Sequence, residues 1–384
     1  MSTHTLRGRR LRRSAALAVA LAAVLVVGLT AASSSARTAQ PAATKAAAFS
    51  IVLNNNYTGN EWRVEMEKIA QAMATSDNPY KGHVSFKIVD SQNDPSSQIT
   101  TLNDIIATHP NAILIDAASP TALNGVVQKA CSAGIVVVSF DSLVTNKCAY
   151  RVDEDASSLY SANSAWMFKT LRGEGSVAED IGIAGAPLST ASINAFKAQQ
   201  AKYHGIKVVG TYQGSYAPGP NQKAIADLLA AGKTIDGIYV AGGGSFGAIQ
   251  ALINAKHPFV PVTNFGDIGT QTIQFAQKYS HSGLSMQFAS NPPTLSGYAL
   301  QVAWAALNHQ SPFVWGMRQG KDSKEVLLPS VVYNTNGIKS GVANVTTLPA
   351  TQLYKLLKPS LPSDTQMPYS IAQAPVTQAQ VFGK

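Results

Sequence analysis

Amide and aromatic side chains are concentrated in the segment NNNYTGNEWRVEM, residues 54–66, directly after an apolar run. Amides both donate and accept hydrogen bonds, and aromatic rings offer flat apolar surface with little rotamer entropy to lose. Single polar residues also follow later apolar runs. The candidate ligand-binding residues are Asn55, Asn56, Tyr57, Asn60, Trp62, Asp116, Asp141, Asp267 and Asn291. Such groups hydrogen-bond to, and stack on, a small polar ligand.

Catalytic chemistry has no comparable signature in the sequence. No nucleophile with an adjacent histidine and acid is discernible, and no pair of catalytic carboxylates stands out. The seven histidines are scattered and nowhere sit at metal-ligand spacing, so we predict no metal site, no cofactor and no enzymatic activity.

The elements that must position the candidate residues are predicted strands alternating with helices. Apolar runs at 49–53, 84–89, 112–115 and 135–140 predict four strands. Between them, apolar residues recur at helical spacing. Asp94-Pro95 and Ser119-Pro120 each combine a helix N-cap residue with a proline at the first helical position.

A second series of strands follows. These strands are expected near 180–184, 206–209, 235–240, 260–265 and 284–288. Strands that are apolar throughout and joined by helices imply a parallel sheet covered on both faces, so we predict two similar doubly wound α/β lobes. Ligands bind beyond the carboxyl ends of such strands, where the candidate residues lie, although any one Asp or Asn there can instead cap the next helix or form an Asx turn.

The N-terminus carries an export pattern. Five arginines between positions 7 and 13 precede an uncharged apolar stretch at 15–32, and Ser34 and Ala36 suit a signal peptidase. The pattern predicts a signal peptide at 1–36 and an exported protein, in a periplasm or on the outer face of the cell membrane. A membrane anchor is the alternative, because about 18 apolar residues can just span a bilayer. Arg12-Arg13 also permits a twin-arginine signal.

Charge and cysteine content restrict the partners and the compartment. Removing residues 1–36 takes away five arginines and no acid, so the formal net charge falls from +9 to +4. No remaining basic run interleaves with aromatic residues, so we predict no nucleic-acid partner. Cys131 and Cys148, 17 positions apart, are predicted to form a disulfide after export, with two buried free thiols as the alternative.

Six segments in order resemble one known family. They are NNNYTGNEWRVEM, VDSQNDPSSQITTLNDIIA, AILIDAASPTALNGVVQKACSAGIVVVSFDS, GIAGAPLSTASINAF, IDGIYVAGGGSFGAIQAL and SNPPTLSGYALQVA. These segments, spread over about 48–338, resemble the successive blocks of the type I periplasmic sugar-binding proteins, the ribose-binding-like receptors of ABC importers.

The resemblance implies a fold, a ligand and a partner. Two lobes joined by three crossovers would close on one sugar, with 48–154 plus about 292–327 forming the first lobe and 155–291 plus about 328–350 the second. Residues 351–384 would form a loosely held tail. The ligand would be a small sugar or related polyol, with a monosaccharide as the leading candidate. A monomeric receptor would deliver it to the membrane permease of an ABC importer.

The resemblance also implies roles for individual residues, with two departures. Asn60 and Trp62 fall where the family has a sugar-binding amide and aromatic ring in the first lobe. Asp141 falls where the family has a carboxylate that binds sugar hydroxyls, and Asn291 falls near a hinge position that makes a polar contact. Two positions where the family often has arginine hold Ser142 and Ser192 instead. Losing two bidentate donors argues against ribose itself as the ligand.

Two other functions remain open from the sequence. A receptor of the same fold can signal to a membrane sensor or chemoreceptor instead of a permease. The motif GGGSFG at 242–247 satisfies G-x-G-x-x-G between a predicted strand and helix, with Asp267 about 20 residues beyond it, as in dinucleotide-binding enzymes. Its late position in an exported chain disfavours the enzyme, because any tight strand-to-helix turn needs glycine.

Overall fold

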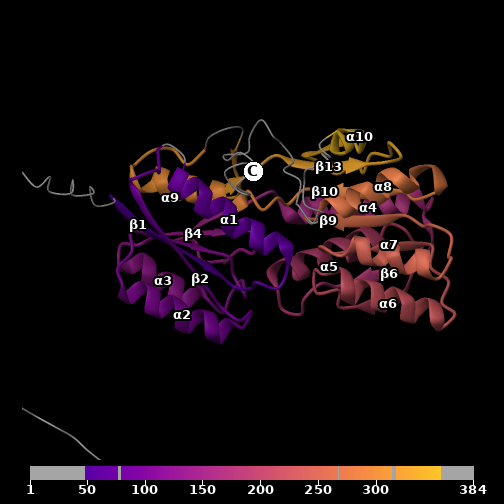
Figure 1. Cartoon of the computed structure of the whole chain (residues 1–384), viewed down its shortest axis with the longest axis horizontal. Helices are drawn as coiled ribbons and strands as arrows, with labels where there is room; N and C mark the ends of the chain where they lie inside the picture. Colours follow the sequence, from indigo (N-terminus) through magenta and orange to yellow (C-terminus); the bar gives the residue numbers. More distant parts are fainter. Residues whose placement is uncertain (1–47, 77–78, 267, 314–316, 356–384) are drawn as a thin grey trace, which may run out of the picture. The chain divides into compact units, whose positions relative to one another are not determined.

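The computed structural model describes residues 48–76, 79–266, 268–313 and 317–355 (Figure 1). The predicted signal peptide at 1–36 and the candidate residue Asp267 lie outside the described residues. The described helices include none that is both long and apolar enough to cross a membrane.

The described strands form two sheets of seven strands each. The first sheet has the order β11-β12-β5-β4-β3-β1-β2, and only the edge pair β11·β12 is antiparallel. Its strands are β1 (Phe49–Asn55), β2 (Val84–Asp90), β3 (Ala112–Ile115), β4 (Val136–Phe140), β5 (Tyr150–Asp153), β11 (Arg318–Gln319) and β12 (Glu325–Leu327).

The second sheet has the order β14-β13-β10-β9-β8-β6-β7, and only β10·β13 is antiparallel. Its strands are β6 (Glu174–Asp180), β7 (Gly205–Tyr212), β8 (Gly237–Tyr239), β9 (Val262–Phe265), β10 (Met286–Ala289), β13 (Ser330–Asn334) and β14 (Val345–Pro349). The mostly parallel sheets confirm the predicted α/β class.

Helices cover both faces of each sheet. The first lobe, meaning the first sheet with its helices, contains α1 (Glu61–Ser76), α2 (Pro95–Ala107), α3 (Asn124–Ser132) and α9 (Leu295–Leu307). The second lobe, meaning the second sheet with its helices, contains α4 (Ala156–Thr170), α5 (Pro187–Gln200), α6 (Pro218–Ala230), α7 (Ser245–Asn254), α8 (Thr270–Tyr279), the short 3-10 helix η1 (Ser280–Ser282) and α10 (Thr351–Tyr354). The late helix α9 packs beside α1, as Figure 1 shows.

The alternating side chains of the strands explain these layers. In β1, Ile51 and Leu53 join the apolar cluster formed with α1 and α9, whereas Val52 joins the cluster formed with α2 and α3. In β8, Ile238 likewise packs with α7 and α8, while Tyr239 packs with α4 and α5. Successive residues of a strand point to opposite faces, so a strand that is apolar throughout needs cover on both.

The chain passes between the two sheets three times, as the three-crossover fold requires. The passages follow β5, β10 and β12, and they are hydrogen-bonded to one another. Leu328 N donates to the Asp153 carbonyl at 2.8 Å, and Ser290 N donates to the Val331 carbonyl at 2.9 Å. The Ser330 hydroxyl donates to the carbonyl of Glu154. The passages therefore form one connected hinge segment.

Two local predictions need correction. The strand expected near 180–184 is β6, which ends at Asp180, because Gly182 has a positive φ of 70° that turns the chain. Ser119 caps a turn through the Ala122 amide, and α3 begins later, at Asn124. Of the tail expected at 351–384, Thr351–Tyr354 form α10 with a buried Leu353, and 356–384 lie outside the described residues.

Two predicted local features are confirmed. Asp94 accepts a hydrogen bond from Ser97 N at 2.7 Å and caps α2, which begins with Pro95. Cys131 and Cys148 form a disulfide between α3 and the segment before β5, with their Cα atoms 6.3 Å apart.

Candidate functional site

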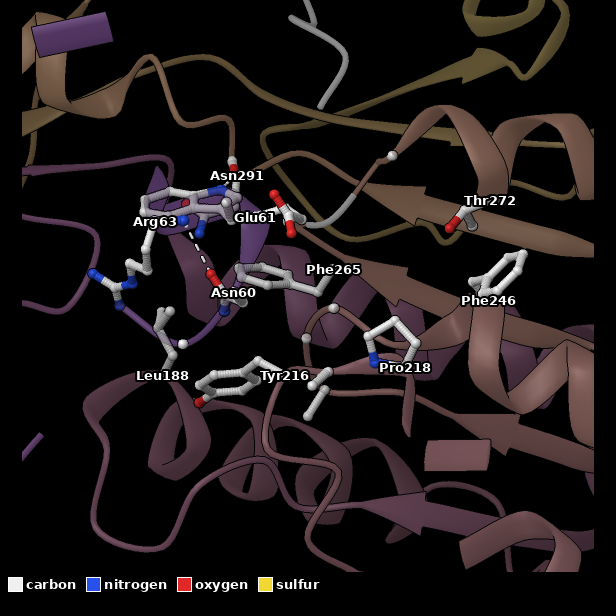
Figure 2. A pocket seen from close by; sticks show the side chains of 18 of the residues that line it. Asn60, Glu61, Arg63, Leu188, Tyr216, Pro218, Phe246, Phe265, Thr272 and Asn291 are labelled. Atoms are coloured by element: carbon white, nitrogen blue, oxygen red, sulfur yellow. Dashed lines mark hydrogen bonds between the residues drawn. The ribbon is translucent and has the colours of Figure 1, made fainter. Parts of the chain in front are cut away.

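A cavity of about 340 Å³ lies at the carboxyl ends of strands from both sheets. In Figure 2, Asn60 and Arg63 come from the first lobe, while Tyr216, Pro218, Phe246 and Thr272 come from the second. The lining also includes Glu61, Trp62, Asp141, Tyr160, Leu188, Ala217, Ala241, Gly242, Gly243, Phe265, Gly266, Gln271 and Asn291. This is the edge of a parallel sheet at which ligands bind.

The structure brings together four of the nine predicted ligand-binding residues. Asn60, Trp62, Asp141 and Asn291 line the cavity. The other residues with a described position are outside its lining, and these are Asn55, Asn56, Tyr57 and Asp116. The polar side chains at this end of the first sheet thus include some that line the cavity and others that pack outside it.

Asn60 has a structural task as well as a place in the cavity. Its side-chain oxygen accepts the Arg63 backbone N–H at 3.0 Å, drawn as a dashed line in Figure 2, and so caps the start of α1. Its amide nitrogen has no partner among the described residues and remains available as a donor.

Trp62 is both a core residue and a wall of the cavity. Only 6% of its surface is exposed, and it packs with Met66 in the apolar cluster of the first lobe. Its Nε1 donates to the Asn291 carbonyl oxygen at 2.6 Å. The indole therefore holds the hinge segment that follows β10.

Arg63 is the main charged residue that the sequence analysis missed. Its guanidinium forms ion pairs with Asp116 and, at 3.1 Å, with Asp141, and its carbon Cζ lies 5.0 Å from the centre of the Trp62 ring. Asn55 Oδ1 lies 3.5 Å from Nη1. Its position right after Trp62 was the available signal.

Burial sets the electrostatics of this ion network. Burial lowers the pKa of the Arg63 guanidinium, against the effect of Asp141. Burial also raises the pKa of Asp141, while Arg63, the Asn291 amide and the Ser142 hydroxyl oppose that shift by stabilising the carboxylate. The Asn291 amide donates to Asp141 Oδ1 at 2.6 Å, and the ring of bonds from Arg63 through Asp141 to Asn291 and Trp62 is thereby closed.

The predicted residues outside the lining support this network or the loop before it. Asn55 donates to Glu67 Oε1 at 2.5 Å, and burial raises the pKa of Glu67 to about 7. Asn56 donates to Asn93 Oδ1 at 3.3 Å. The Tyr57 backbone N–H donates to Asn55 Oδ1 at 3.3 Å.

Aromatic side chains form the opposite wall. Tyr160 and Phe265 stack with ring centres 4.0 Å apart and planes 19° from parallel. Tyr216 lies next to Ser189, with the two hydroxyl oxygens 2.5 Å apart. Phe246 packs on Phe275, with the two ring centres 4.7 Å apart. Tyr216 and Phe246 come after the second-sheet strands β7 and β8, and Phe265 ends β9, whereas the sequence analysis considered aromatic rings only after the first strand.

Two residues of the cavity lining have a left-handed backbone. Asp141 has a φ of 56° and Tyr216 a φ of 53°, both in the left-handed region. Asp tolerates this conformation, but a bulky tyrosine rarely adopts it. Strained residues that persist in a fold are typical of functional sites.

The two serines at arginine positions do not supply polar groups to the cavity lining. Ser192 is fully buried, and its hydroxyl lies 2.9 Å from the Tyr239 hydroxyl. Ser142 Oγ lies 3.5 Å from Asp141 Oδ2. The cation nearest to the cavity is instead Arg63, from a different element.

The glycine motif has a packing explanation. A side chain at Gly242 would meet Tyr216, one at Gly244 would meet Asn221, and one at Gly247 would meet the Pro218 carbonyl. The turn into α7 therefore needs these glycines to approach the segment after β7. Among the described residues, no group of three or more His, Cys, Asp or Glu side chains could hold a metal ion.

Comparison with known proteins agrees with this geometry. The family described as "Periplasmic binding protein domain" matches residues 51–311, more than half of the chain. The chain belongs to this family of periplasmic binding proteins. No curated protein matches this periplasmic binding protein.

Many solved structures share the fold of this periplasmic binding protein. An ABC transporter solute-binding protein from Thermobispora bispora is 26% identical, with a TM-score of 0.61 over 73% of this chain and 85% of that chain. The arabinose-binding protein of a Shewanella ABC transporter, bound to L-arabinofuranose, is 19% identical, with a TM-score of 0.64 over 80% and 94%. The fructose-binding periplasmic domain of a hybrid two-component system is 18% identical, with a TM-score of 0.63 over 75% and 91%.

Proposed function

We propose that this protein is an exported receptor that captures one small uncharged polyhydroxylated ligand, with a monosaccharide as the leading candidate, and delivers it to an ABC-type permease. The observation that carries the proposal is the buried Asp141 carboxylate, oriented by Arg63 and Asn291 at the edge of a cavity lined by aromatic rings.

The cavity offers the groups that a sugar needs. An ionised carboxylate only accepts hydrogen bonds, so Asp141 would receive sugar hydroxyls, while the free amide nitrogen of Asn60 would donate to a hydroxyl or ring oxygen. Trp62 and Phe265 supply flat apolar surface for the sugar's C–H face. The cavity volume of about 340 Å³ lies at the small end of ligand pockets, which suits a single sugar ring.

Charge argues for an uncharged ligand. The described charged residues of the lining are Glu61, Arg63 and Asp141, and the Arg63 guanidinium is already paired with Asp141 and Asp116. A carboxylate or phosphate on the ligand would face two acids without an unpaired cation. We therefore expect uronic acids and sugar phosphates to bind much more weakly than the parent sugars.

The lobes proposed for ligand capture are 48–154 with about 292–327, and 155–291 with about 328–350. Hinge bending at the three passages would close them on the ligand, as in other two-lobe receptors. A single chain contains both walls of the cavity, so a monomer suffices for binding.

Signalling is the second candidate function, and one comparison favours it. The fructose-binding periplasmic domain named above has the same fold and belongs to a hybrid two-component system. Stimulation of the ATPase activity of a permease encoded beside this protein, by sugar-loaded receptor, would support transport. Binding to a sensor ectodomain without any such stimulation would support signalling.

Thermal unfolding with a ligand panel tests the binding proposal. The panel contains D-arabinose, L-arabinose, D-allose, D-fructose, D-galactose, D-galacturonate, ribose 5-phosphate and NAD. A ligand at 100 times its Kd stabilises the folded state by about 2.7 kcal/mol. We expect stabilisation by at least one uncharged sugar. Stabilisation by NAD alone would favour a dinucleotide site and contradict the proposal.

A further inference from the structure

One buried carboxylate joins three segments of the second lobe. Asp180, at the end of β6, is only 1% exposed. Its Oδ1 accepts the backbone N–H groups of Gly182 at 2.8 Å and Gly214 at 2.7 Å, and its Oδ2 accepts that of Ala241 at 3.2 Å. These amides follow β6, β7 and β8, which are neighbours in the sheet with β6 in the middle.

Two of these segments form part of the second-lobe wall of the cavity, and the segment after β6 leads into α5, whose Leu188 also lines it. The segment after β7 carries Tyr216 and Pro218, and the segment after β8 carries Ala241 itself. The Ala241 carbonyl accepts the Tyr160 hydroxyl at 2.9 Å, and Tyr160 stacks on Phe265. A displacement of Ala241 would therefore also move the stacked ring pair.

The sequence makes room for this carboxylate. A side chain at Gly214 would collide with Asp180 and with Asn221, so only glycine lets that amide approach. Burial raises the pKa of Asp180 to about 6, although the three N–H bonds oppose the shift. The ionised carboxylate is thus kept at a cost in stability, a sign of a group retained for function rather than for folding.

We propose that Asp180 is a positioning residue, whose ionised carboxylate fixes the second-lobe wall in the shape that binds ligand. Asp180 lies behind the lining and does not itself line the cavity. The inference rests on the proposed function, because the wall matters only if a ligand binds there.

The surroundings of Asp180 determine what else titrates. Glu179 precedes Asp180 in β6. Four tyrosines face Asp180: Tyr160 from α4, Tyr212 from β7, Tyr216 from the segment after β7, and Tyr239 from β8. Burial raises the pKa of each tyrosine, so all four stay neutral below pH 8. Burial also raises the pKa of Glu179, to about 7, so Glu179→Gln is needed as a comparison.

The direct test compares Asp180→Asn with Asp236→Asn. Asp236 accepts the Ser176 backbone N–H at 2.7 Å near the start of the same strand, away from the cavity. In Asp180→Asn, the new amide group would point a donor at one of the three N–H groups. We expect the tightest-binding uncharged sugar of the panel to lose at least tenfold in affinity at pH 7.5. We expect Asp236→Asn to stay within twofold of wild type.

A pH comparison separates positioning from unfolding. Between pH 7.5 and pH 5.0, wild-type and Glu179→Gln protein should lose sugar affinity severalfold as Asp180 takes up a proton, while the melting temperature does not fall. Asp180→Asn should show a smaller decrease, and the remainder is due to Asp141, whose pKa burial also raises. An unchanged affinity in Asp180→Asn, or the same decrease in Asp180→Asn as in wild type, would overturn the proposal.

Hydrogen exchange tests the positioning without any ligand. In ligand-free protein at pH 7.5, the amides of Gly182, Gly214 and Ala241 should be protected, and Asp180→Asn should lose protection, most of all at Ala241. If wild type binds no sugar but shows this pattern, the proposed function fails while the positioning role stands. Full protection of all three amides in Asp180→Asn would refute the positioning role.

Discussion

The Asn291 side-chain amide donates a 2.6 Å hydrogen bond to Asp141 Oδ1, joining the passage after β10 to the end of β4 across 150 positions of sequence. The Asn291 carbonyl in turn accepts the Trp62 indole N–H. One residue of the hinge thus fixes both the carboxylate and the ring that we expect to contact the ligand.

Asp141→Asn should weaken sugar binding by about 1–3 kcal/mol, or roughly five- to 150-fold, because the amide places a donor where hydroxyls and Asn291 need an acceptor. Isothermal titration calorimetry measures the change. Asp227→Asn is the matched control, since Asp227 is exposed and paired only with Lys223 on α6. Equal affinities for wild type and Asp141→Asn would remove Asp141 from the ligand site.

Trp62→Phe should lower affinity while leaving most of the core intact. The variant keeps an aromatic ring but leaves the Asn291 carbonyl without its indole donor, an effect of about 1–3 kcal/mol. Trp304→Phe is the control, because Trp304 packs edge-on against Phe49 and Tyr80 and does not line the cavity. Loss of stability with unchanged affinity in Trp62→Phe would make Trp62 a core residue only.

Arg63→Met should destabilise the fold by about 3–5 kcal/mol, because it leaves the buried Asp116 and Asp141 carboxylates without their cation. Urea unfolding of the ligand-free protein gives the free energy. Arg318→Met removes a partly exposed ion pair to Asp155 and should cost at most about 1 kcal/mol. Similar effects of the two variants would show that the Arg63 network contributes no more than a surface ion pair.

The ligand-free protein should become more stable as the pH falls from about 8 to about 5. Burial raises the pKa of Asp153 to about 7 and of Glu154 to about 8. Asp153 ends β5, and Glu154 begins the passage that leads from β5 to the second sheet. A raised pKa means that the folded state binds the proton more tightly than the unfolded chain does. The resulting stabilisation is complete below the unfolded pKa and is lost as the pH rises through the folded one.

Melting temperatures between pH 5.0 and pH 8.5 measure this dependence. Glu154→Gln should flatten the part of the profile near pH 8, where Glu154 titrates. Asp104→Asn on the surface of α2 should leave the profile unchanged. A melting temperature that rises with pH across this range would contradict the assignment of buried, protonated acids to the hinge.

Central strands were predictable because burial on both faces leaves a plain signal. The strands β1, β3 and β4 lie inside the first sheet, contain apolar runs, and were each located within two residues at their ends. The strands β11, β12 and β14 have only two to five residues and no such run, so the order of the outer strands was not predictable. In the segment DIGIAGAP the isoleucines imitate a strand, while the glycines turn the chain.

The candidate site was predictable in part from polar and aromatic residues that come after strands. Asn60 and Trp62 lie between five and seven residues after β1, Asp141 directly follows β4, and Asn291 follows β10. Arg63 was missed because its partners Asp116 and Asp141 come from other strands, so their ion pairs depend on tertiary structure. Tyr216 was missed because β7 continues to Tyr212, beyond the strand end expected at 209.

Calorimetric titration of the ligand-free protein with paired sugars tests the central claim most directly. D-galactose and D-galacturonate have the same ring and differ in a carboxylate, and each other uncharged sugar of the panel is titrated in the same way. We expect saturable binding of one uncharged sugar per chain. If galactose is that sugar, galacturonate should bind at least tenfold more weakly. No heat from any uncharged sugar, together with binding of an anionic one, would contradict the central claim.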